Sequence, residues 1–176
     1  YAVYKYPQTR KKAMKAKKVN LKFFPEGGNL VKGVPSQVAF EATDAYGNPI
    51  TLFGRIINRR KEEIGHFATI HEGRGVFTYI PTGEDADKAE VELGGKKYRF
   101  DLPEVCSQGY VLHVDNLTSE DSIAVSVQKN TYTPSNLLGL AVIAHGKLLN
   151  SCLLNVGKNT PVSFKLDKSE WTPGVV

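Results

Sequence analysis

The sequence lacks any hydrophobic run long enough to cross a bilayer. Its most apolar stretch, residues 137–144, is only as long as one strand, whereas a membrane-spanning helix needs about 18 or more consecutive apolar residues. We therefore expect no membrane span in this chain. The sequence starts at Tyr1 without a signal-like segment. We expect it to be a fragment of a longer polypeptide, in which such a segment would lie upstream.

Cysteine is also scarce. Cys106 and Cys152 are the two cysteines in 176 residues, and they allow either one disulfide or two free thiols. A scaffold that depends on disulfides is much denser in cysteine, so we expect the core to form without a bridge. We interpret Cys152 as a small buried hydrophobic residue.

Motifs for cofactor chemistry are missing as well. There is no Gly-x-Gly-x-x-Gly between a strand and a helix and no Gly-Lys-Ser/Thr phosphate loop. His66 and His71 are five residues apart, so on an extended strand they face opposite sides and do not share a metal ion. His145 and Cys152 can approach through a hairpin, but a Cys–His nucleophile also needs an oxyanion hole and an orienting partner. We assign no catalytic, cofactor-binding or metal-binding residue and predict that the chain is not an enzyme.

The net charge of +5 is concentrated at one end of the chain. The first 19 residues carry seven basic side chains and no acidic one, which leaves 16 basic and 18 acidic residues, a charge of −2, for the rest. Such a leader can bind nucleic acid or an anionic lipid surface. We favour a solvated linker between domains and expect no nucleic-acid partner. The basic residues are Lys5, Arg10, Lys11, Lys12, Lys15, Lys17 and Lys18.

Two acidic clusters and three aromatic side chains also stand out. Neither cluster has the spacing of a dedicated calcium loop, so we interpret both as solvated turns. The clusters are Glu84, Asp85 and Asp87, and Asp115, Glu120 and Asp121. Tyr46, Tyr132 and Trp171 have rings that can stack on sugars, but we favour packing in the core or between domains.

Most of the sequence from Leu21 onward consists of short alternating segments separated by turn residues. Val38, Phe40 and Ala42 fall on one face of an extended strand, and residues 44–49 supply turn chemistry. The clearest hairpin has alternating segments on either side of Gly94-Gly95. These patterns predict an all-β fold of the sandwich type.

The alternating segments divide into two groups. Residues 20–104 hold about seven predicted strands, enough for one compact sandwich, and Pro103-Glu104 interrupts the pattern. Residues 105–176 form the second group, in which we expect at least one closing strand to be missing. Residues 137–144 are apolar on both faces, which is typical of a central strand. A helix over 137–154 is the main alternative, but its glycines and β-branched residues disfavour it.

Several segments resemble macroglobulin-type domains, the alpha-2-macroglobulin-like domains of large cell-envelope proteins of Bacteroidetes. The first is Phe23-Phe24-Pro25-Glu26-Gly27-Gly28-Asn29-Leu30-Val31-Lys32-Gly33-Val34-Pro35-Ser36. Asp44-Ala45-Tyr46-Gly47-Asn48-Pro49 and Gly73-Arg74-Gly75-Val76-Phe77 follow, and the second half contributes Ala144-His145-Gly146-Lys147-Leu148-Leu149 and Trp171-Thr172-Pro173-Gly174-Val175. On the residues alone, we interpret the Phe-Phe-Pro-Glu-Gly-Gly segment as a structural corner.

The resemblance implies two tandem immunoglobulin-like β-sandwiches in a periplasmic, outer-membrane-associated or extracellular protein. It implies a non-catalytic structural or protein-interaction role, with other domains of the parent chain and an envelope or extracellular protein as partners. Two alternatives remain open, a macroglobulin-type protease-inhibitor array and an adhesion or glycan-binding module. The reactive thioester of some relatives needs Cys-Gly-Glu-Gln, which neither Cys106 nor Cys152 matches.

Overall fold

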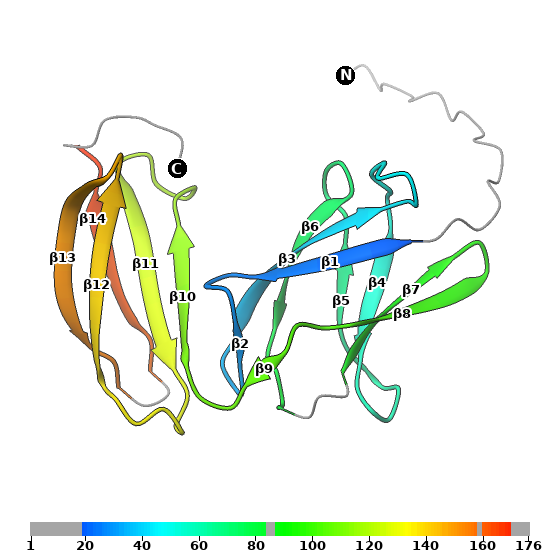
Figure 1. Cartoon of the computed structure of the whole chain (residues 1–176), viewed down its shortest axis with the longest axis horizontal. Coiled ribbons are helices and arrows are strands. Elements are labelled where there is room, and N and C mark those ends of the chain that lie inside the picture. The colour runs from blue at the N-terminus through cyan, green and yellow to red at the C-terminus, as the bar shows by residue number, and fades with distance from the viewer. Residues whose placement is uncertain (1–18, 84–86, 158–159, 170–176) are drawn as a thin grey trace, which may run out of the picture.

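The computed structural model describes residues 19–83, 87–157 and 160–169, and these residues form strands and connections without a helix (Figure 1). The strands form two groups side by side, each with two facing sheets. The predicted all-β class with tandem sandwiches is confirmed. Within the described ranges, no helix is long and apolar enough to span a membrane.

The first module is a sandwich of three strands against four. The three-stranded sheet has the order β1-β3-β6 and the four-stranded sheet the order β5-β4-β7-β8, and all its pairs are antiparallel. The strands are β1 (Asn20–Pro25), β3 (Ser36–Thr43), β4 (Phe53–Ile57), β5 (Glu63–Ala68), β6 (Arg74–Tyr79), β7 (Lys88–Leu93) and β8 (Lys96–Asp101). The hairpin predicted around Gly94-Gly95 is β7–β8.

Alternation along these strands sends every second side chain into an aromatic core. Phe40 and Phe67 meet edge to face with ring centroids 4.9 Å apart, and Phe77 lies 5.4 Å from Phe67. Such edge-to-face contacts add to the gain from burying the rings. Gly54 makes room for the Phe67 ring, since an added Cβ would lie 2.3 Å from its Cζ atom. Val19, which the sequence interpretation gave to the leader, is 8% exposed and belongs to this core.

The second module faces a three-stranded sheet, ordered β10-β11-β14, with the hairpin β12–β13. Its strands are β10 (Tyr110–Asp115), β11 (Ser122–Lys129), β12 (Leu137–Ala144), β13 (Lys147–Asn155) and β14 (Val162–Asp167). Residues 137–154 are therefore strands and not a helix. The module repeats the strand pairing of the first one through five strands within its described residues.

Two very short strands join the modules. β2 (Leu30–Val31) and β9 (Val105–Cys106) pair in parallel, with Leu30 opposite Val105. The pair continues with a hydrogen bond from the Lys32 backbone N–H to the Cys106 carbonyl at 3.0 Å. The segment that leaves the first module is thereby fixed to the turn that follows β1, and β10 starts beside it (Figure 1).

Candidate functional site at the junction of the modules

Glu26 links the two modules through both of its carboxylate oxygens. It lies directly after β1, while its partners lie on β10. Oε2 is 2.6 Å from Nδ1 of His113, and Oε1 accepts the Val114 backbone N–H at 2.8 Å. Hydrogen bonds to a charged acceptor are stronger than neutral ones. The carboxylate therefore fixes both a side chain and the backbone of the second module.

Gly27 allows the close approach that these hydrogen bonds require. Its φ is +79°, a left-handed conformation that glycine adopts without a steric penalty. An added Cβ would lie 3.3 Å from the backbone nitrogen of Leu112 on β10. The predicted role of the Gly27-Gly28 segment as a corner is confirmed, and the corner rests directly on the second module.

Asn130, in the loop between β11 and β12, forms a second link. It is 4% exposed, and its Nδ2 donates to the Ser107 carbonyl at 2.7 Å and to the Lys32 carbonyl at 3.2 Å. The Thr133 hydroxyl lies 2.7 Å from Asn130 Oδ1 and accepts the Gly109 N–H at 2.8 Å. One amide side chain thus holds the first module, the connecting segment and the second module together.

Lys129 shapes the loop that carries Asn130. This lysine is 0% exposed, and its ammonium donates to three acceptors at the loop end. The acceptors are the Thr133 carbonyl at 2.7 Å, the Ser135 carbonyl at 3.0 Å and Asn136 Oδ1 at 2.6 Å. A buried charge is costly unless it is hydrogen-bonded, and all three donors of this ammonium have acceptors. Lys129 therefore determines the loop conformation.

Apolar side chains close the junction. Val31, Val34 and Val111 form a separate buried cluster, each 5% exposed or less, with contributions from both modules. Exclusion of water strengthens the neighbouring polar contacts. The junction thus combines a small dry contact, two polar links and a parallel strand pair, and it can fix the angle between two domains.

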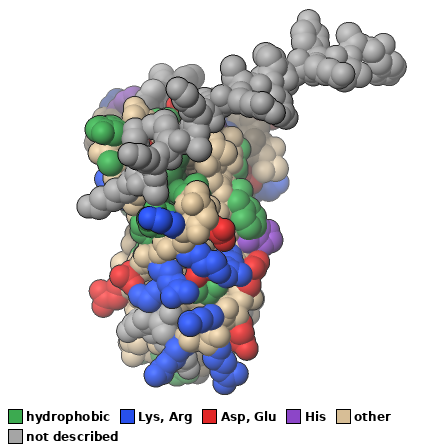
Figure 2. All heavy atoms as spheres, turned by 90° about the vertical axis from the view of Figure 1, so that its right-hand side faces the viewer, with side chains coloured by type: hydrophobic (Ala, Val, Ile, Leu, Met, Phe, Trp, Pro, Cys, Tyr) green, Lys and Arg blue, Asp and Glu red, His purple; other side chains and the backbone are tan. Residues whose placement is uncertain are grey.

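A buried carboxylate lies on the outer face of the four-stranded sheet. Glu90 is 4% exposed and accepts hydrogen bonds from Arg55 at 2.6 Å and Arg99 at 2.9 Å. The hydrogen bond from Arg55, followed by that from Arg99, lowers the pKa of Glu90 from 4.5 to about 2. Figure 2 shows basic side chains gathered on the face of the molecule that carries β7 and β8. Because the buried Glu90 carboxylate is paired with Arg55, Arg99 and Lys97, we interpret this cluster as stabilising the sheet.

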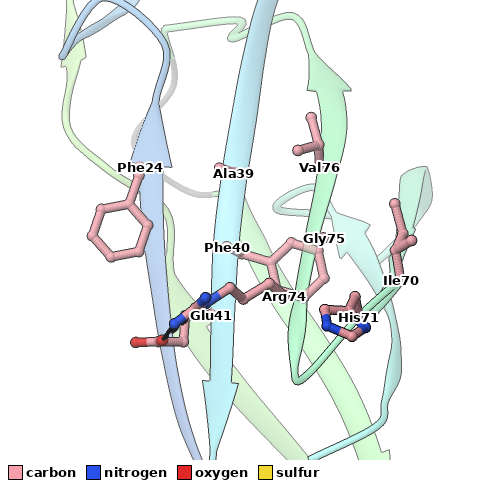
Figure 3. A pocket seen from close by; sticks show the side chains of 9 residues that line it. All are labelled: Phe24, Ala39, Phe40, Glu41, Ile70, His71, Arg74, Gly75 and Val76. Carbon is pink, nitrogen blue, oxygen red and sulfur yellow. Dashed lines mark hydrogen bonds and ion pairs between the residues drawn. The ribbon is translucent and has the colours of Figure 1, made fainter. Parts of the chain in front are cut away.

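A shallow hollow of about 510 Å³ lies on the outer face of the three-stranded sheet (Figure 3). Phe24, Ala39 and Val76 stand opposite one another on β1, β3 and β6. Phe24 is 52% and Val76 51% exposed, so small Ala39 forms the floor between two larger apolar side chains. The ion pair between Arg74 and Glu41, 3.3 Å apart, borders the hollow. This surface can receive an apolar side chain of another protein.

The structure does not bring the chemically reactive residues together. His71 is 84% exposed in a turn, and His66 stacks on Phe53 with ring centroids 6.0 Å apart. Cys152 pairs with Leu140, which lies five residues before His145, a separation of about 16 Å of extended chain. No group of three or more His, Cys, Asp or Glu side chains in the described ranges is arranged to hold a metal ion.

The expectation of a buried Cys152 is wrong. Cys152 is exposed on β13, where eight of the nine residues lie at the surface. Cys106, on β9, is half-buried, and both cysteines are free thiols.

The aromatic side chains expected to pack in the core or between domains differ in their surroundings. Tyr46 is 75% exposed and does not lie in the core. Tyr132 is 62% exposed and also lies outside the core, but its ring lies under the Lys32 ammonium of the first module, 5.9 Å from the ring centroid. Trp171 lies outside the described residues.

The acidic clusters are partly described. Asp87 accepts a hydrogen bond from the Tyr79 hydroxyl at 2.6 Å, and burial together with this bond raises the pKa of Tyr79. Asp115 accepts the N–H groups of Leu117 and Thr118, as expected of a solvated turn, and hydrogen bonds with Thr118 and Leu117 lower its pKa to about 2. Glu84, Asp85 and most of the basic leader, residues 1–18, lie outside the described residues.

Neither a protein-family model nor a curated protein matches this chain. The chain is similar to a solved structure of E. coli alpha-2-macroglobulin in its native conformation. The sequence identity is 12% and the TM-score 0.34, with 86% of this chain covered. The chain spans 12% of the length of that alpha-2-macroglobulin chain. These values identify neither a family nor an activity.

Sequence reasoning missed the junction. Glu26 and His113 are 87 residues apart, and Asn130 and Lys32 are 98 apart. Local patterns carry no information on such pairs. One signal was present: Gly27-Gly28 follows a charged residue at a predicted corner, where glycine permits another backbone to come close.

Proposed function

We propose that this chain is a non-catalytic pair of macroglobulin-like modules within a longer secreted or envelope-anchored polypeptide. It holds neighbouring domains at a fixed angle and presents surfaces for contact with another envelope or extracellular protein. The observation that carries the proposal is the junction, where Glu26 and Asn130 reach across the boundary between the modules. Domains joined by a flexible linker move independently by default, so such contacts support a structural role.

The junction is tested by measuring how the two modules tumble. We expect ¹⁵N relaxation to give one common rotational correlation time for strands of both modules. In Glu26→Ala, which removes both acceptors of the link, we expect the modules to tumble at different rates while each retains its chemical-shift pattern. Glu72→Ala is the matched control, because Glu72 is exposed in a turn and its ion-pair partner is the neighbouring His71. Independent tumbling of the unaltered chain would refute a rigid spacer.

The hollow around Ala39 favours protein contact as the second part of this role. Removing Phe24 from its rim should weaken partner capture without loss of fold, since that side chain is 52% exposed. We expect Phe24→Ser to capture less partner from solubilised envelope than the unaltered chain. Leu112→Asp, which places a charge in the second core, serves as the misfolded control. Equal capture by Phe24→Ser and the unaltered chain would place the contact elsewhere.

A further inference from the structure

The hollow on the outer face of the three-stranded sheet has an apolar part and a charged border (Figure 3). The apolar part lies between Phe24 and Val76. Two residues further along the same face, one side chain of each strand is charged, and two of the three are basic. These border residues stand opposite one another and are Lys22, Glu41 and Arg74. The border has a net charge of +1, so the hollow fits an apolar group on an acidic segment.

The turn between β10 and β11, residues 115–121, carries such an apolar group. Leu117 is 96% exposed, the largest value among the exposed large apolar side chains of the described residues. Asp115 fixes the turn, because its Oδ1 accepts the backbone N–H groups of Leu117 at 2.9 Å and Thr118 at 3.0 Å. A side chain presented on a fixed backbone loses less conformational freedom when it binds. Leu117 is therefore prepared for contact with another surface.

The charge of this turn is opposite to that of the border. Residues 115–121 include three carboxylates and no basic side chain. The Lys168 ammonium donates to the Ser119 carbonyl at 2.9 Å, so three negative charges and one positive charge give a net charge of −2. Opposite charges steer two surfaces together and set their orientation. Since Leu117 is exposed, it does not occupy the hollow of its own molecule.

The junction already shows a contact of this kind between two modules. There the corner after β1 rests on β10, and Glu26 reaches His113. The sheet β10-β11-β14 corresponds to β1-β3-β6. When the middle core-facing residue of β10 is superposed on that of β1, Asp115 takes the position of Glu26, and Phe24 that of His113. Because phenylalanine stands in place of histidine, an apolar tip such as Leu117 fits there better than a carboxylate.

We propose that the hollow binds the β10–β11 turn of a second copy of this chain. Leu117 of one copy lies between Phe24 and Val76 of the next, and the carboxylates of the turn lie beside Lys22 and Arg74. The two surfaces differ, so each added copy leaves one turn and one hollow free for further copies. The proposal rests on the proposed function in one respect, that the hollow is a surface for protein contact, and it names the partner.

Two complementary variants test this contact by sedimentation equilibrium. Leu117→Ser removes the apolar tip and keeps the hollow, whereas Phe24→Ser removes one wall of the hollow and keeps the tip. The unaltered chain should associate with a dissociation constant on the order of 0.1–1 mM, as expected of a small contact. Each variant alone should associate roughly tenfold more weakly or less. An equimolar mixture of the two should form dimers that do not grow, because it contains one functional pair of surfaces.

The matched control is Leu153→Ser, which removes a 73% exposed apolar side chain on β13, outside the proposed contact. It should associate as the unaltered chain does. Equal weakening by Leu153→Ser would overturn the proposal, because the association would then be unspecific. Association that Leu117→Ser does not weaken, or a mixture without dimers, would overturn it as well. Amide spectra of all three variants should match the unaltered chain away from the substitution, which shows that they are folded.

The outcomes also separate this proposal from the proposed function. If the unaltered chain stays monomeric at about 1 mM while Phe24→Ser still lowers capture from the envelope, a neighbouring module or another protein fills the hollow. The second copy is then wrong, and the proposed function holds. Self-association that both variants weaken, without any change in capture, supports the second copy and places the envelope contact elsewhere.

Discussion

At the scale of single residues, polar side chains join segments that are far apart in the sequence. Glu26 makes two hydrogen bonds to the second module, and Asn130 makes one to the first module and one to the connecting segment. Glu90 does the same within one sheet, where it joins Arg55 on β4 to Arg99 on β8. Buried polar groups of this kind stabilise a fold only when their partners are present, because an unpaired buried charge is costly.

Replacing the Glu90 carboxylate should destabilise the first module. Glu90→Gln removes the charge that accepts hydrogen bonds from Arg55 and Arg99, and charged hydrogen bonds of this kind contribute about 1.5–3 kcal/mol each in general. We expect a net loss of about 1–3 kcal/mol in the free energy of unfolding by urea. Glu92→Gln, an exposed position on the same strand, is the control and should change stability by less than about 0.5 kcal/mol.

The same carboxylate predicts a dependence of stability on pH. Its pKa is lowered from 4.5 to about 2 in the folded state, so folding favours the ionised form. The resulting stabilisation is complete above about pH 4.5 and is lost as the pH falls toward 2. The unfolding free energy of the unaltered chain should therefore decrease more steeply across this window than that of Glu90→Gln. Parallel curves for the two proteins would contradict this prediction.

At the scale of strands and turns, the sequence contained most of the information. The β7–β8 hairpin follows from alternation around Gly94-Gly95, and β3 follows from the apolar face of Val38 and Phe40. Both signals are local, since the side-chain period of a strand is two residues. The short strands β2 and β9 could not be predicted, because each has two residues and their parallel pairing joins Leu30 to Val105.

The burial of Lys129 could not be predicted from the sequence either. Lysine is almost never fully buried unless it is paired, and its acceptors come from a loop whose conformation the sequence does not reveal. The exposure of Cys152 could not be predicted either, since the sequence of β13 does not show that eight of its nine residues lie at the surface. Side-chain periodicity predicts which face a residue occupies but not what covers that face.

Two glycines in equivalent strands should respond differently to substitution. Gly54 on β4 has the Phe67 ring 2.3 Å from an added Cβ, whereas Gly139 on β12 has nothing within 4 Å. Because overpacking a core usually costs about 1–3 kcal/mol, we expect Gly54→Ala to lower the unfolding free energy by that amount. Gly139→Ala should be neutral or stabilising by up to about 1 kcal/mol, since alanine restricts the unfolded chain. Equal effects in urea unfolding would contradict the packing of Phe67.

At the scale of the whole molecule, the two modules differ in the size of their hydrophobic cores. Among the described residues, the first module has an aromatic core between sheets of three and four strands, and the second has a smaller, aliphatic core between sheets of three and two strands. Stability follows buried apolar area to a first approximation. The contacts at the junction are too few to give both modules the same stability. We therefore expect each module to unfold with its own free energy.

Hydrogen exchange should measure this difference in stability between the two modules directly. In the unaltered chain, we expect amides in β11 and β12 to exchange roughly tenfold or more faster than amides in β3 and β7 under the same conditions. The reason is the number of buried side chains, five in the second core and twelve in the first among the described residues. Identical slowest exchange rates in the two modules would instead mean that they unfold as one cooperative unit.

The parallel pairing of β2 with β9 also bears on how the chain responds to tension. A pull from the second module acts on β9 beyond Cys106, while the resisting load reaches β2 from β1, before Leu30. The two loads act at opposite ends of strands that run in the same direction. Their hydrogen bonds are then sheared together rather than opened one after another. We therefore expect a force applied through the second module to load this pair in shear at the exit from the first module.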